Sequence, residues 1–125
     1  MTNKQTSPLQ PDIPLLDREG ALKRLQNDTE FLNVLYDAFL EDLPNKLKAI
    51  DEAVSSGQIQ LMQRTSHSLK GAAATVGAAA LRETALAMEM AAREGDTDRV
   101  NVLYPELKSK AGQTQREMSG VLENS

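Results

Sequence analysis

The stretch DTEFLNVLYDAFLEDLPNKLKAIDEAVSSG, residues 28–57, decides the fold class more than any other part of the chain. Its apolar residues recur at steps of one, three or four, the spacing of one face of an α-helix. They are Phe31, Leu32, Leu35, Phe39, Leu43, Leu47, Ile50 and Val54. The pattern predicts a long amphipathic helix that begins after Asp28 and ends at Gly57. Because Pro44 removes a hydrogen bond in its middle, we expect the helix to kink there or to break and restart.

One short helix and three more long ones are predicted around it. The short helix lies in LLDREGALKRLQ, residues 15–26, with Asp17 as its N-cap. The other long helices are expected over residues 58–76, 78–95 and from Asp96 to about residue 122. No segment alternates with period two, and the connections are short enough to make neighbouring helices antiparallel. The predicted fold is all-α: an up-and-down antiparallel four-helix bundle with a short extra helix at the N-terminus.

The chain divides into a tail and one domain. Residues 1–14 carry three prolines among polar residues, which predicts a flexible tail or linker rather than a helix. Residues 15–125 should form the bundle domain, because a chain of 125 residues is large enough for one core of ordinary size.

Composition argues against several classes of function. A net charge of −4, a pI near 5.0 and the lack of a basic stripe argue against nucleic-acid binding, which needs a positive surface. Without cysteine there is no disulfide, thiolate nucleophile or cysteine-based zinc site. No apolar run approaches the length of a membrane span, and the first ten residues lack the apolar core of a signal peptide. We therefore expect a cytoplasmic protein without membrane insertion.

The only histidine, His67, opens the stretch HSLKGAAATVG, residues 67–77. Each helical residue turns by roughly 100°, so His67 lies about 160° from Leu69 at the centre of the apolar stripe. The ring is therefore expected to point at solvent. Its neighbours on that face are Arg64, Lys70, Gly71 and Ala74, with Ala78 continuing the line past Gly77. We take Arg64, Gly71, Ala74 and Ala78 as candidate partner-docking residues.

Two neighbours of the ring favour a chemical role. Glycine inside a helix costs roughly 1 kcal/mol relative to alanine, so Gly71 is better explained by clearance for an approaching protein. The Lys70 ammonium disfavours the imidazolium form, and it can pair with a phosphoryl oxygen once the group has been transferred. Together these residues point to an imidazole that carries a group rather than one that acts as a base.

Other interpretations stay open at this point. Acyl transfer would need an orienting carboxylate and an oxyanion hole, which no spacing in the chain proposes. A metal site has little support, since one histidine leaves only scattered carboxylates as further ligands. An enzyme with His67 as general base would need a concave pocket around the ring. A purely structural or adaptor bundle would use the small-residue face for docking alone.

At these residues the chain resembles the histidine-containing phosphotransfer (HPt) domains of bacterial His-Asp phosphorelays. The family pattern is His, any residue, Leu, Lys, Gly, small residues, then Gly-Ala and a following Leu. It is matched by His67, Leu69, Lys70, Gly71, Ala72, Ala73, Gly77, Ala78 and Leu81. MEMAAREGD, residues 88–96, is similar to the family's apolar-Glu segment, and the likeness extends over about residues 15–107. Ser66 and Gln58 depart from it, but they concern packing or capping more than chemistry.

The resemblance implies a phosphorelay intermediate. His67 would accept a phosphoryl group through Nε2 from a receiver-domain aspartate and pass it to another receiver. Lys70 would assist electrostatically. The chain would be a monomeric carrier rather than an enzyme, with no cofactor and no ATP site of its own, and it has no Gly-rich phosphate loop. The Mg²⁺ needed for transfer would sit on the receiver. Met1 favours a free-standing protein, whereas the proline-containing tail resembles a linker to a hybrid sensor kinase.

Overall fold

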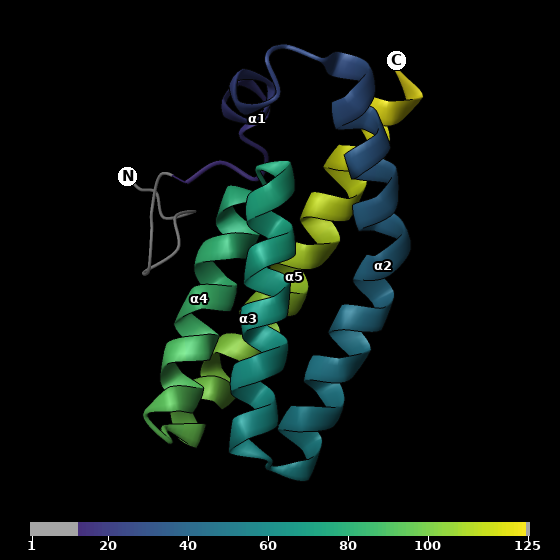
Figure 1. The fold of residues 1–125 in the computed structure, drawn as a ribbon. Coiled ribbons are helices and arrows are strands. Elements are labelled where there is room, and N and C mark those ends of the chain that lie inside the picture. Colours follow the sequence, from purple (N-terminus) through teal and green to yellow (C-terminus); the bar gives the residue numbers. More distant parts are fainter. Residues whose placement is uncertain (1–12, 125) are drawn as a thin grey trace, which may run out of the picture.

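The computed structural model describes residues 13–124, and all the regular structure in that range is α-helical (Figure 1). The helices are α1 (Arg18–Arg24), α2 (Thr29–Ser56), α3 (Ile59–Val76), α4 (Ala79–Arg93) and α5 (Thr97–Glu123). The four long helices run up and down beside one another, and the short α1 lies at one end of them (Figure 1). The predicted four-helix bundle with a short extra N-terminal helix is therefore confirmed.

The ends of the helices follow local sequence signals. The side chains of Asp17, Asp28 and Asp96 each accept a hydrogen bond from the backbone N–H three residues further on. These bonds satisfy donors that the first turn of a helix leaves free. Gly57 and Gly77 adopt left-handed φ angles of 69° and 74°, and these conformations end α2 and α3.

Helix α2 passes through Pro44 without a break, so the alternative of a break and restart was wrong. Pro44 is exposed. On that side of the helix, water can bond the carbonyl that loses its N–H partner.

The core lies between the four long helices. Its largest fully buried side chains are Tyr36, Leu32, Leu43, Ile50, Leu69, Leu81, Met88, Leu107 and Met118. Phe31, predicted to lie on the buried face of α2, is instead 46% exposed, and Tyr36 is buried. Among the described residues, no helix is both long enough and apolar enough to span a membrane.

The segment before α1 is attached to the turn between α3 and α4. Of the tail predicted for residues 1–14, only the last two residues lie in the described part of the chain, and neither is helical. The Asp17 N–H donates to the Gly77 carbonyl at 2.7 Å, and the Ala80 N–H donates to the Pro14 carbonyl at 3.0 Å. A Cβ at Gly77 would lie 2.7 Å from the Asp17 carbonyl oxygen. Glycine is thus required there by the close approach as well as by its φ angle.

Candidate functional site

Helix α3 displays His67 on the side opposite the core. The His67 side chain is 65% exposed, whereas Leu69, two residues away, is fully buried. The direction worked out from helical geometry is confirmed.

A carboxylate from α4 holds the imidazole. Glu89 Oε2 lies 2.9 Å from His67 Nδ1, although the two residues are 22 positions apart in sequence. Lys70 Nζ lies 2.8 Å from the other carboxylate oxygen, Oε1. Arg93 Nη2 lies 3.2 Å from Oε2, one turn further along α4. A single carboxylate thus joins the ring to two cations, and only 4% of Glu89 is exposed.

The protonation of this cluster follows from its contacts. Burial raises the pKa of the Glu89 carboxyl, but hydrogen bonds and positive charge from Lys70 and His67 outweigh burial and leave that pKa below its ordinary value. An ionised carboxylate can only accept hydrogen bonds, so Nδ1 of His67 must be the donor. In the neutral ring the lone pair is then on Nε2, which no hydrogen bond from residues 13–124 occupies. The site presents one nucleophilic nitrogen toward solvent.

Lys70 contacts the carboxylate instead of standing free beside the ring. Its side chain is only 23% exposed, and its ammonium is paired with Glu89. Lys70 is therefore linked to the imidazole through the Glu89 carboxylate, which contacts both side chains. A role toward a transferred phosphoryl group remains a prediction.

The structure places three of the four candidate docking residues on the surface. Arg64 and Gly71 are exposed, and a Cβ added at Gly71 would have no heavy atom within 4 Å. Ala74 is half-buried, and its carbonyl accepts a hydrogen bond from Arg24 of α1 at 3.2 Å. The open face beside His67 consists of Arg64, Gly71 and Ala74.

The predicted place of Ala78 on this face was wrong, because Ala78 is 0% exposed. The left-handed conformation of Gly77 ends α3, and the chain turns into α4 in a new direction. Helical spacing counted from His67 therefore does not extend past Gly77, and Ala78 packs in the core.

Sequence reasoning missed Glu89 and Arg93 as site residues. No spacing in the chain proposed an orienting carboxylate, because Glu89 reaches the ring from a different helix. The signal lay in MEMAAREGD, residues 88–96, which holds both residues but was singled out only for its family likeness. Periodicity predicts the direction of a side chain on its own helix, but not which neighbour it meets.

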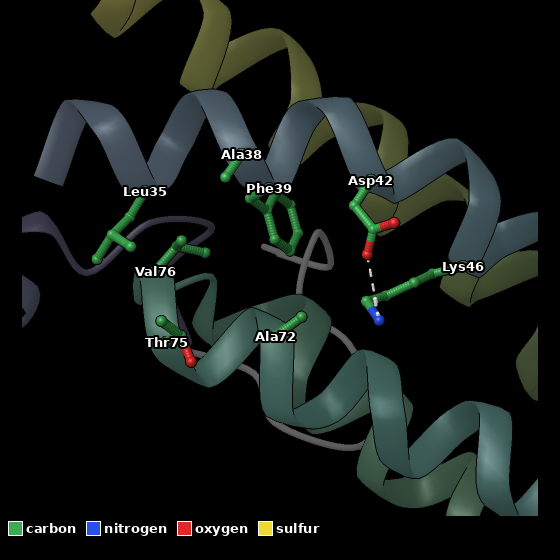
Figure 2. A pocket seen from close by; sticks show the side chains of 8 residues that line it. All are labelled: Leu35, Ala38, Phe39, Asp42, Lys46, Ala72, Thr75 and Val76. Carbon is green, nitrogen blue, oxygen red and sulfur yellow. Dashed lines mark ion pairs between the residues drawn. The ribbon is translucent and has the colours of Figure 1, made fainter.

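A shallow groove of about 200 Å³ lies between α2 and α3 (Figure 2). Its lining residues are Leu35, Ala38, Phe39, Asp42, Lys46, Ala72, Thr75 and Val76. Lys46 pairs with Asp42 at 3.3 Å, as Figure 2 shows, and donates to the Ser68 hydroxyl at 2.8 Å. His67 does not line this groove, so it provides no pocket for general-base chemistry at the ring.

Within residues 13–124, no three side chains of His, Cys, Asp or Glu are grouped so that they could hold a metal ion. The Glu89 carboxylate instead contacts the His67 ring, the Lys70 ammonium and the Arg93 guanidinium.

Fold and site together define an all-α bundle that exposes one carboxylate-bound histidine. The Hpt domain family model matches residues 34–117, and the chain belongs to this family. It is 38% identical over 63 residues to the phosphorelay protein LuxU of Vibrio vulnificus, from strains YJ016 and CMCP6. That alignment covers 50% of this chain and 55% of LuxU, so the chain spans about half the length of the curated relatives it matches.

A solved structure extends the likeness to nearly the whole fold. The chain is similar to histidine-containing phosphotransfer protein B (HptB) of Pseudomonas aeruginosa PAO1, with a TM-score of 0.81 and 26% sequence identity. The superposition covers 90% of this chain and 97% of HptB.

Proposed function

We propose that this chain is a phosphorelay intermediate in which Nε2 of His67 accepts a phosphoryl group from a receiver aspartate and passes it to another receiver. The observation that carries the proposal is the contact between Glu89 Oε2 and His67 Nδ1, which leaves the lone pair on the exposed nitrogen. Membership of the Hpt family supports it, as do the phosphorelay and phosphotransfer roles that the names of LuxU and HptB state.

The geometry supplies what each direction of transfer needs. In acceptance, the Nε2 lone pair attacks phosphorus and the bond between phosphorus and the aspartate oxygen breaks. The receiver aspartate leaves as a carboxylate with the electron pair. No proton has to leave the ring, because Nε2 carries none. The product is a cationic ring with its Nδ1–H still bonded to the Glu89 carboxylate.

Donation reverses these steps. An aspartate of the second receiver attacks phosphorus, the P–N bond breaks, and the ring leaves with the electron pair. Nδ1 keeps its proton throughout, and this N–H stays hydrogen-bonded to the Glu89 carboxylate. The leaving group is therefore a neutral imidazole instead of an imidazolate anion. Glu89 therefore serves both directions by fixing one tautomer.

The remaining site residues have supporting roles in this proposal. Lys70 neutralises and orients Glu89. Gly71 gives clearance, and Arg64 and Ala74 border the surface that a receiver would contact. The chain acts as a monomeric carrier in the cytoplasm, without an ATP site of its own, and the receiver supplies the Mg²⁺. Its net charge of −4 supports a protein partner over a nucleic acid.

A transfer assay tests the proposal. After incubation with a phosphorylated receiver domain, the protein should carry acid-labile, base-stable label on His67. The change His67→Gln should abolish the label while lowering the free energy of unfolding by no more than about 1 to 2 kcal/mol, because the side chain is largely exposed and Lys70 and Arg93 still pair with Glu89 when the bond from the ring is lost. Lys70→Ala should slow transfer without eliminating it. Label on His67→Gln would identify a different acceptor, and binding without label would favour an adaptor.

Ring tautomers test the role of Glu89 separately. Nitrogen-15 NMR of the wild-type ring should show the Nδ1–H form at neutral pH. The near-isosteric change Glu89→Gln should lower the share of this form and slow transfer, because an amide can donate to the ring as well as accept from it. An unchanged tautomer in Glu89→Gln would refute this role.

A further inference from the structure

Arg93 is the less constrained of the two cations that contact Glu89. Its side chain is 59% exposed, and its 3.2 Å contact with Oε2 is longer than the contacts of Lys70 and His67 with the carboxylate. It shares Oε2 with His67 Nδ1, so the guanidinium lies beside the imidazole. Arg93 can leave this contact without exposing a buried charge, because Lys70 still pairs with Oε1.

Formal charges show why Arg93 has a second use. In the form that attacks phosphorus the ring is neutral, and the Glu89 carboxylate then faces this ring and two cations, Lys70 and Arg93, so the cluster has one positive charge in excess. A phosphoryl group brings roughly two negative charges near neutral pH. The ring becomes cationic at the same time, because Nε2 is substituted while Nδ1 keeps its proton. Lys70 and the cationic ring then compensate Glu89, and the guanidinium is available to the phosphoryl oxygens.

We propose that Arg93 binds the phosphoryl group in the phosphorylated state, moving from Glu89 Oε2 to the phosphoryl oxygens on His67 Nε2. This inference rests on the proposed function. The planar guanidinium presents paired N–H donors that match the geometry of phosphoryl oxygens, which the single ammonium of Lys70 does not. Neutralising those oxygens opposes loss of a metaphosphate-like group. Arg93 therefore protects the carried group from water between one receiver and the next.

The test needs no receiver, so its outcome is separate from the transfer assay. Potassium phosphoramidate should phosphorylate His67 directly: the Nε2–P bond forms, the P–N bond of the reagent breaks, and ammonia leaves. Once the reagent is removed, the loss of label gives the hydrolysis rate, and phosphorus-31 NMR gives the protonation midpoint of the phosphoryl group. The titration reports contact with the phosphoryl group, which a merely structural role of Arg93 would not alter.

We expect Arg93→Gln to speed hydrolysis by up to about fivefold, the usual size of one exposed charged contact. It should also raise the midpoint of the phosphoryl titration, because a neighbouring cation favours the dianion. Arg93→Lys should lie between wild type and Arg93→Gln. The matched control is Arg82→Gln, which removes a 42% exposed arginine from the same helix, about 16 Å away along its axis. This control should behave as wild type.

Each alternative outcome is decisive. Unchanged hydrolysis and titration in Arg93→Gln would show that Arg93 does not contact the phosphoryl group. Equal changes in Arg93→Gln and Arg82→Gln would assign the effect to general surface charge and overturn the inference. A wild-type protein that phosphoramidate cannot label at His67 would contradict the proposed function itself. Failed transfer from a receiver alongside normal phosphoramidate results would contradict only the choice of partner.

Discussion

Replacement of Gly71 should change stability and function in opposite directions. Gly71 lies inside α3, one turn beyond His67, and a Cβ added there would meet no heavy atom within 4 Å. Gly71→Ala should therefore raise the free energy of unfolding by about 0.4 to 1 kcal/mol, through helix propensity and lower entropy of the unfolded chain. For a chain of this size, that gain corresponds to a rise in Tm of about 1.5 to 4 °C.

A longer side chain at the same position should impair transfer. Gly71→Gln keeps a good helix former, but it places a flexible side chain across the approach to His67. If a receiver must come close there, crowding the interface costs about 1 to 3 kcal/mol, and transfer slows roughly 5- to 150-fold. The assay compares transfer rates from one phosphorylated receiver to wild type, Gly71→Ala and Gly71→Gln, alongside melting curves.

Gly120 in α5 offers a matched control, because a Cβ there also meets nothing within 4 Å. Gly120→Gln should hold or raise Tm and leave transfer unchanged. A wild-type rate in Gly71→Gln would refute the idea that glycine provides clearance. Unfolding of Gly71→Gln would instead contradict the placement of this helix face in solvent.

Three further changes test the packing and the charges of the bundle. Ser66 is fully buried, and its hydroxyl has no hydrogen-bond partner among the described residues. Ser66→Ala should therefore raise the free energy of unfolding by about 1 kcal/mol, measured as a higher urea midpoint. Burial and the hydrogen bond to Asp51 raise the pKa of Tyr104 to about 12. That stabilisation is fully present below about pH 10 and is lost as pH rises through 12, so Tm should fall more steeply there in wild type than in Tyr104→Phe. Because the pKa of Glu89 is lowered from its ordinary value of 4.5, the ionised carboxylate stabilises the fold at pH values above 4.5. This contribution is lost as the pH falls through the folded-state pKa. Between pH 5 and pH 3, the urea midpoint of Glu89→Gln should therefore depend less on pH than that of wild type.

Local interactions made the helices predictable. Asp28 and Gly57 mark the ends of α2 because a cap bonds backbone groups within one turn of itself. Apolar spacing located the core stripe for the same reason, as it depends only on the rotation per residue. Phe31 was assigned wrongly because its burial depends on whether a neighbouring helix reaches the first turn of α2, and none covers it fully.

The amino-acid sequence by itself determined the all-α class, the helix limits and the outward direction of His67, since each follows from contacts within a few residues along the chain. Only the tertiary structure brought Glu89 and Arg93 to the ring, because their positions depend on how α4 packs against α3. It also buried Ala78. The left-handed Gly77 ends α3 and redirects the chain, so the helical spacing counted along α3 no longer applies after it. The imidazole was visible in the sequence, but the carboxylate that fixes its proton comes from a different helix, and packing alone decides that pairing.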